Sequence, residues 1–436
     1  MSFFSSSSST AIRQSALNIL HHSSPFAPQC QSSRRFNSAT PKHARQVLGR
    51  IDVKQIGVPL RRGSGQASGS LPRPHIWRPI AFFLGVSTVT YIAAAEYTNR
   101  DTAYWASRLG SGGAGAWWRR STGSGVTGYS DREMARAKTL ESARKAQAHV
   151  NALPQILSFL PPSVVQPIMR LYVTSAEFFI NRSPAQIVPL GLISGMATVW
   201  IMWKIPRYQG FMRRWFLSHP VVYSSTPSKA WANCVGMATS VFSHQSGSHL
   251  LFNSIGLYSF GAAAYTFLAT PPPSPQGFIL PSATYTPHFL AFFLTAGLFA
   301  SLASTLYTNI FRLPLLLRTL ASPARLSSAQ ALAAHYAISP SLGASGAVYA
   351  TLTLTALAYP NTSVSLIFLP FFPIPISLGV GGLVLFDIVA LIRGWRVFDH
   401  VAHLGGALFG VLYYQYGREF FLSLRRRLQK DRVYSR

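Results

Sequence analysis

A serine between glycines opens one of the apolar stretches of this chain. Residues 342–349 read Leu-Gly-Ala-Ser-Gly-Ala-Val-Tyr and place the Ser345 hydroxyl at the start of a long apolar run. Small residues also let membrane helices approach closely, and taken alone this packing role is the simpler interpretation. A second apolar stretch, residues 399–410, changes the balance because it carries the imidazole of His403. A serine and a histidine inside a membrane together suggest hydrolysis.

The composition is that of a polytopic membrane protein. Of 436 residues, 48% are hydrophobic, 13% are aromatic and only 11% are charged, which excludes an ordinary soluble protein. The net charge of +28 could indicate nucleic acid or an anionic membrane surface, and the membrane is the simpler partner. Two cysteines, Cys30 and Cys234, provide neither a disulfide framework nor a metal cluster. We expect no cofactor and no metal.

The first 75 residues resemble a targeting segment. Residues 1–75 are rich in Ser and Arg and contain a single acidic residue, Asp52. This composition is typical of a mitochondrial transit peptide, so we expect a multi-pass protein of a mitochondrial membrane. A basic disordered tail is the alternative interpretation.

One apolar segment and a long linker follow the leader. Residues 76–97 have the length needed to span a bilayer. The linker, residues 98–183, begins with a glycine-rich stretch. Within it, residues 130–133 have the spacing of a capping box and predict a solvated helix over 134–150. Residues 156–180 contain prolines and Arg170, and this segment is suited to lying in the membrane interface.

Six further apolar segments form the predicted core, residues 184–417. The expected fold is therefore all-α, with one N-terminal transmembrane helix followed by six core spans. The proline-rich residues 370–375 are expected to form a loop, and residues 418–436 a basic C-terminal tail. The core spans are expected at residues 184–202, 249–268, 289–307, 342–359, 376–392 and 400–416.

The topology brings the polar residues of these spans together. The chain reverses direction between spans, so the second, fourth and sixth core spans all start at the same side of the membrane. His249 and Asn253 lie in the first turns of the second span, Ser345 in the first turn of the fourth, and His403 in that of the sixth. His249 and Asn253 are four residues apart and therefore share one helix face. An interhelical hydrogen bond between them is the alternative to a catalytic role.

Glycines extend the helix face that carries the histidine. Gly406 and Gly410 follow His403 by three and seven residues. This face is expected to pack closely against the region of Gly343 and Gly346.

Peptide hydrolysis by a serine needs a base for the hydroxyl proton and donors for the oxyanion. His403 is the candidate base and later the acid that protonates the leaving amine. The Ser345 amide and the side chains of His249 and Asn253 are the candidate oxyanion donors. Tyr349 lies four residues after Ser345, where its ring could stack on the imidazole.

These residues resemble the rhomboid family of intramembrane serine proteases. The family pattern combines His-x-x-x-Asn, Gly-x-Ser-Gly and an Ala-His-x-x-Gly stretch, found here at 249–253, 343–346 and 402–406. The resemblance covers the six-span core. It implies that Ser345 and His403 form a Ser-His dyad without an obligatory acid, with His249, Asn253 and the Ser345 amide as its oxyanion hole.

The sequence is most similar to the mitochondrial, presenilin-associated rhomboid-like subgroup, because of residues 395–403, the extra span and the leader. This resemblance implies the inner membrane, with single-pass transmembrane proteins as substrates, such as a dynamin-like GTPase. One departure is that Trp231 is followed by Ala232 where the family often has Trp-Arg. The rival interpretations are a rhomboid-like protein that binds membrane clients without cutting them and a carrier or import subunit.

Other polar positions have weaker expectations. His244 and His400 lie near span ends, where interfacial histidines are common. Asp387 lies well inside the fifth core span, and pairing with a neighbouring polar group is expected ahead of orienting His403. The arginines at 425–427 are expected to bind anionic lipid.

Overall fold

The computed structural model describes residues 76–109, 129–221, 227–272, 280–320, 338–366, 369–395 and 397–434. The predicted leader, Cys30 and the glycine-rich part of the linker lie outside these residues. Within them the chain is almost entirely helical, as the apolar segments predict, and the fold is that of an all-α polytopic membrane protein.

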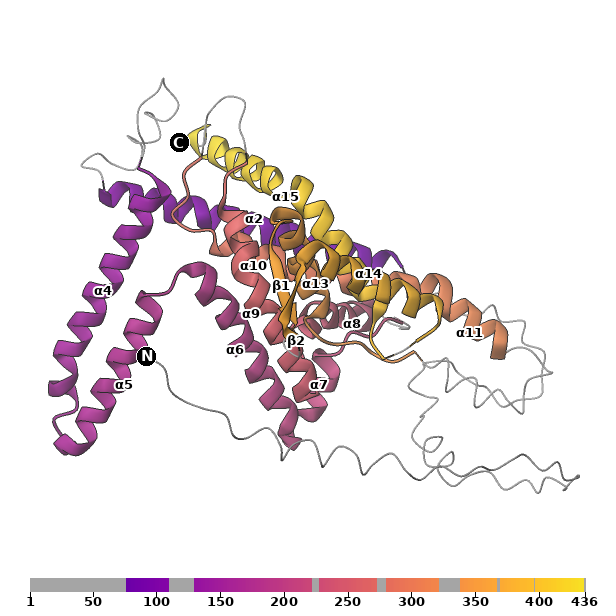
Figure 1. Cartoon of the computed structure of the whole chain (residues 1–436), viewed down its shortest axis with the longest axis horizontal. Coiled ribbons are helices and arrows are strands. Elements are labelled where there is room, and N and C mark those ends of the chain that lie inside the picture. The colour runs from indigo at the N-terminus through magenta and orange to yellow at the C-terminus, as the bar shows by residue number, and fades with distance from the viewer. Residues whose placement is uncertain are drawn as a thin grey trace, which may run out of the picture. The chain divides into compact units, whose positions relative to one another are not determined.

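Helix α13 (Ser345–Ala358) lies at the centre of the bundle (Figure 1). It packs most extensively against α9 (Gly247–Ala269), α10 (Thr286–Tyr307) and α15 (His400–Tyr434), and less extensively against α14 (Ile376–Ile392). At 14 residues, α13 is about 21 Å long, shorter than the ~30 Å hydrocarbon core. The residue at its first turn therefore does not reach the membrane surface if the other end does.

The connection between the first two predicted core spans is itself helical, which the sequence did not predict. After α6 (Pro184–Lys204) come α7 (Gln209–Trp215) and α8 (Pro227–Thr239), with short 3₁₀ turns at Pro206–Tyr208 and Ser240–Phe242. A single bridge joins Ser218 to Ser341, just before α13. This connection therefore helps to fix the segment that leads into Ser345.

Helix α2 (Trp77–Leu109) runs parallel to α15. Its residues pair in the same order along both helices, since Tyr91 stacks on Tyr413 at 6.2 Å and Asn99 donates to the Arg425 carbonyl at 3.0 Å. Helix α2 starts one residue later than predicted and continues 12 residues beyond the predicted end at 97. Because the two helices are parallel, α2 begins at the end of the bundle where His403 lies.

The linker contains two helices, α4 (Asp131–Ile156) and α5 (Pro162–Ile180). The predicted capping box is present, because the Ser130 side chain accepts from the Glu133 amide and the Glu133 carboxylate accepts from the Ser130 amide. Helix α5 buries none of its residues, and its position in the membrane interface stays a prediction.

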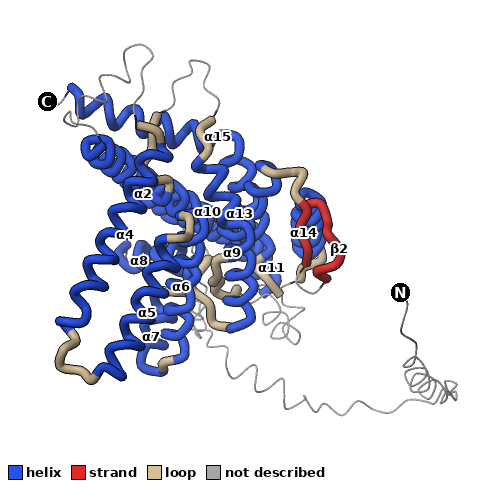
Figure 2. The backbone as a smooth tube through the Cα atoms, turned by 60° about the vertical axis from the view of Figure 1, so that its left-hand side comes forward, coloured by secondary structure: helices blue, strands red, loops and turns tan. Residues whose placement is uncertain are grey.

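The expected loop at residues 370–375 is instead a strand. Strands β1 (Ser363–Leu366) and β2 (Leu369–Pro375) form an antiparallel hairpin that pairs Ser363 with Pro375 and Val364 with Ile374. Figure 2 shows this hairpin beside α14 (Ile376–Ile392) at the edge of the bundle. Prolines fit an edge strand because such a strand leaves one row of amides unpaired.

The predicted C-terminal tail is also wrong in form. Helix α15 does not end near Gly417 but extends to Tyr434, and it is 35 residues long in all. Nor does Arg425 bind lipid, since its side chain is 1% exposed and donates to Asn99 Oδ1 at 2.8 Å and to the Pro281 carbonyl at 2.9 Å. A run of three arginines looks uniform in sequence, but successive helix positions face different surroundings.

Length and composition identify three helices among the described residues that could cross a membrane: Trp77–Leu109, Pro184–Lys204 and Thr286–Leu316. The last range includes a π-helical turn (Thr308–Arg312) and part of α11 (Leu313–Leu320). Shorter apolar helices include α13 and α14. The arrangement of one span plus six stays a prediction.

Candidate active site

The predicted nucleophile and base lie within hydrogen-bond distance. Ser345 is the first residue of α13, and its Oγ lies 3.0 Å from Nε2 of His403 in the first turn of α15. Asp399 caps α15, because its Oδ1 accepts from the Ala402 amide at 3.1 Å and its Oδ2 accepts from the Ser304 hydroxyl at 2.7 Å. The cap fixes where the helix starts.

Glycines let α13 and α15 approach backbone to backbone, as their spacing predicts. A Cβ on Gly406 would collide with the carbonyl of Gly346, and one on Gly410 would lie 2.6 Å from the carbonyl of Ala350. Gly346 in turn faces the Ala300 methyl group of α10. Larger residues here would separate the two helices that carry Ser345 and His403.

Tyr349 stacks on the imidazole of His403. The ring centroids are 4.4 Å apart and the planes differ by 13°. The spacing of four residues between Ser345 and Tyr349 places both side chains on one helix face. The ring therefore limits rotation of the imidazole beside the hydroxyl.

His249 lies against the loop that precedes Ser345. Gly343 has φ of +127°, and a Cβ there would lie 2.6 Å from Cε1 of His249. Both observations require glycine at this position. Gly343 thus contacts His249, and not the glycine face of α15 that was expected to pack there.

Asn253 reaches the same loop through His244, for which only an interfacial position was expected. Its Nδ2 lies 3.0 Å from Nε2 of His244, and the Ala344 amide lies 3.4 Å from that same nitrogen. Both groups can donate only if Nε2 carries a lone pair. His244 is fully buried, so the expectation of an interfacial histidine is wrong. It lies in a loop, where helical periodicity gives no signal.

Asp387 lies within hydrogen-bond distance of two histidines. Its Oδ1 lies 3.2 Å from Nδ1 of His403 and 2.5 Å from Nδ1 of His400. All three side chains are buried, since Asp387 is 1% exposed, His403 is 8% exposed and His400 is 3% exposed. His400 is therefore a buried partner of Asp387 and not the interfacial histidine that was expected.

Residues 231–419 match the family model of the rhomboid domain. This chain carries a rhomboid domain. The match includes Ser345, His403, His249 and Asn253, and it begins after the first predicted core span.

Mitochondrial relatives are similar to this chain over a longer stretch. "Presenilin-associated rhomboid-like protein, mitochondrial" of Homo sapiens is 30% identical over 254 residues, which cover 58% of this chain and 54% of the relative. Its Danio rerio counterpart, "Presenilin-associated rhomboid-like protein A, mitochondrial", is 29% identical with the same coverage. "Rhomboid protein 1, mitochondrial" of Saccharomyces cerevisiae is 26% identical over 54% of each chain. The alignments thus span about half the length of these relatives. No solved structure matches the chain significantly.

Three side chains of the rhomboid domain have the composition of a metal site. Donor atoms of Asp387, His400 and His403 all lie within 4.8 Å of one another. The hydrogen bonds among them require protons on both Nδ1 atoms, and a metal ion would have to displace those protons. The arrangement favours a hydrogen-bonded unit over a metal centre.

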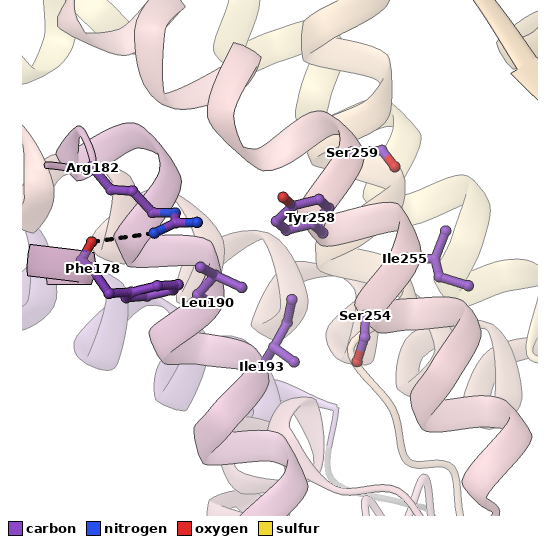
Figure 3. A pocket seen from close by; sticks show the side chains of 8 residues that line it. All are labelled: Phe178, Arg182, Leu190, Ile193, Ser254, Ile255, Tyr258 and Ser259. Carbon is purple, nitrogen blue, oxygen red and sulfur yellow. Dashed lines mark hydrogen bonds between the residues drawn. The ribbon is translucent and has the colours of Figure 1, made fainter. Parts of the chain in front are cut away.

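A separate pocket of about 590 Å³ lies between the end of α5, α6 and α9 (Figure 3). Arg182 stands at its edge, donating to the Phe178 carbonyl at 3.4 Å. None of the residues considered above lines it, so this pocket is distinct from the candidate active site. Its lining residues are Phe178, Arg182, Leu190, Ile193, Ser254, Ile255, Tyr258 and Ser259.

Proposed function

We propose that this protein is an intramembrane serine protease that hydrolyses peptide bonds in or near the transmembrane anchors of other membrane proteins. The observation that carries the proposal is the 3.0 Å distance between Ser345 Oγ and His403 Nε2 within a rhomboid domain. Packing alone explains a serine beside glycines, but it does not explain an imidazole aligned on that hydroxyl by a stacked tyrosine.

The reaction follows from the two side chains. His403 Nε2 takes the Ser345 proton while Oγ attacks the carbonyl carbon, and the same nitrogen then gives the proton to the leaving amine. In the second half of the reaction, water attacks the acyl-enzyme ester, His403 Nε2 takes the water proton, and the same nitrogen returns it to Ser345 Oγ. The first-turn amide of Ser345 has no intrahelical acceptor and, with His249 and Asn253, would hold the oxyanion.

The position of the dyad constrains the substrate. Because α13 is too short to span the bilayer, Ser345 would lie below the membrane surface, and both water and the substrate must reach it there. A helical anchor has to unwind before its peptide bond is accessible, which favours anchors with small or helix-breaking residues. Equal cleavage rates for an all-Leu anchor and a Gly-containing anchor would contradict this substrate preference.

The mitochondrial inner membrane is the proposed location. The composition of residues 1–75 and the mitochondrial relatives support it. Single-pass transmembrane proteins are the proposed partners, with a dynamin-like GTPase of the inner membrane as one candidate.

Labelling with a fluorophosphonate serine probe tests the proposal on the purified protein in detergent. We expect labelling of wild type that both Ser345→Ala and His403→Ala abolish, because only an activated serine reacts. Ser254→Ala is the matched control, since it removes a serine of α9 that lines the separate pocket, and it should label like wild type. Absence of wild-type labelling, under conditions in which a known intramembrane serine protease reacts, would favour a protein that binds clients without cutting them.

A further inference from the structure

Asp387 is an acidic residue in the interior of an apolar helix. Helix α14 buries only four of its residues, and Asp387 is one of them, at 1% exposure. Burying a carboxylate in a membrane helix is costly unless it is hydrogen-bonded, and such residues usually serve function. The partners of this carboxylate are therefore informative.

The carboxylate fixes the tautomer of the proposed base. An ionised Asp387 can only accept hydrogen bonds, so the proton of a neutral His403 ring lies on Nδ1, the atom 3.2 Å from Oδ1. Nε2 then carries the lone pair and points at Ser345 Oγ, 3.0 Å away. This is the state in which the imidazole can accept the serine proton.

A second histidine, His400, also holds the carboxylate. His400 Nδ1 lies 2.5 Å from the same Oδ1, while its Nε2 is buried and has no hydrogen-bond partner among the described residues. This pattern fits a neutral ring that donates from Nδ1 alone. Both imidazoles share Oδ1, while Oδ2 of Asp387 is buried and has no hydrogen-bond partner among the described residues.

We propose that Asp387 is a positioning residue for His403 and that His400 fixes Asp387, which extends the dyad to Ser345, His403 and Asp387. This inference rests on the proposed protease function. When the Ser345 proton moves to Nε2, the imidazolium forms beside the carboxylate, which stays ionised and offsets the new charge. The proton then leaves Nε2 for the departing amine, and Asp387 is never protonated.

A nearby carboxylate provides a matched control. Asp399 lies four residues before His403. Among the described residues, its side chain accepts hydrogen bonds only from the Ala402 amide at the start of α15 and from the Ser304 hydroxyl. Both Asp387→Asn and Asp399→Asn remove one negative charge near the base. Asparagine is as good a helix cap as aspartate, so Asp399→Asn keeps its structural function.

The test measures kcat, KM and thermal stability of purified full-length protein with a cleavable single-pass substrate. For Asp387→Asn we expect kcat to fall by about 10²- to 10⁴-fold at unchanged KM, as when a triad loses its acid. Asp399→Asn should stay within about threefold of wild type, and His400→Gln should lie between the two because the carboxylate remains. A purely structural Asp387 would lower stability and leave kcat of the folded fraction unchanged.

Three outcomes would overturn the inference. The first is an Asp387→Asn protein with wild-type kcat, and the second is an equal fall of kcat in Asp387→Asn and Asp399→Asn. If Asp387→Asn does not fold, the His400→Gln variant tests the inference instead. The third outcome is a wild-type kcat in His400→Gln. Failure of the proposed function is distinguishable, because it would show as a wild-type protein without turnover and without labelling of Ser345.

Discussion

Two buried polar clusters lie at opposite ends of α15, and they use similar chemistry differently. At the start of the helix, one carboxylate contacts two imidazoles, and one of those imidazoles faces a serine hydroxyl. Toward its other end, Arg425 donates to Asn99 Oδ1 at 2.8 Å and to the Pro281 carbonyl at 2.9 Å. The first cluster contains imidazoles, whose ring nitrogens can donate or accept a proton, whereas a guanidinium can only donate hydrogen bonds.

The far-end cluster ties the N-terminal helices to the bundle. Asp131 at the start of α4 accepts from the Tyr285 hydroxyl at 2.6 Å and from the Ser282 amide at 2.7 Å. Lys138 of α4 forms an ion pair with Asp101 of α2 at 2.6 Å. Burial, reinforced by the Asp131 carboxylate, raises the pKa of Tyr285 well above its usual value. Tyr285 therefore stays a donor, and this cluster serves attachment while the other is suited to chemistry.

Among the four variants that compare these two regions, Asn253→Ala is expected to have the largest effect. Losing one oxyanion donor should lower kcat by about 10²- to 10³-fold. Asn309→Ala is the matched control, because Asn309 is a buried amide that donates to the Thr305 and Pro220 carbonyls, neither of which belongs to the candidate site. Steady-state cleavage by both variants checks this. Equal kcat values would remove Asn253 from the proposed oxyanion hole.

Next in size is the effect of Arg425→Met on stability. Removing one partner of a buried charged cluster should lower the free energy of unfolding by about 3 kcal/mol, because Asn99 and the Pro281 carbonyl lose their donor. The kcat of the folded protein should stay within a few fold of wild type. The exposed Arg427→Met is the control and should change stability by less than about 0.5 kcal/mol. Denaturation in detergent measures the free energy of unfolding of both variants. Equal values would contradict a stabilising role of the buried Arg425.

A smaller effect is expected from Gly406→Ala, between the two clusters. The added methyl group would meet the Gly346 carbonyl, so we expect a loss of about 1–3 kcal/mol in the free energy of unfolding and a lower kcat as α13 and α15 separate. Gly381→Ala in α14 is the control, since no atom lies within 4 Å of a Cβ there. It should stabilise the protein by up to about 1 kcal/mol. Effects of the same sign in both variants would contradict the close approach.

The smallest effect concerns the capping box of α4. Hydrogen bonds from the Ser130 amide, and then from its hydroxyl, lower the pKa of Glu133. The folded state therefore binds this proton less readily than the unfolded state. Its stabilising contribution is complete above the ordinary glutamate pKa and is lost as pH falls through the lowered value. The difference in melting temperature between wild type and Glu133→Gln should shrink toward acid pH. A difference independent of pH would contradict this.

Much of the helix bundle could be predicted from sequence because a helix forms its backbone hydrogen bonds and its caps within one short segment of the chain. The capping box at 130–133, the start of α6 at Pro184 and both ends of α14 follow from caps and apolar length. The hairpin before α14 was missed because its hydrogen bonds join strands, and no apolar period marks them. The continuation of α15 was missed because a basic composition by itself does not end a helix.

The sequence alone determined which residues could form the dyad. Spacing and topology place Ser345 and His403 at the same end of the bundle, because alternate spans run in the same direction. Only the tertiary structure decided the partners of the buried polar groups: His244 with Asn253, His400 with Asp387, and Arg425 with Asn99. The physical reason is that such a group in a dry interior takes whichever donor or acceptor lies within about 3 Å. That choice depends on how the helices pack and rotate, which spacing along one chain does not specify.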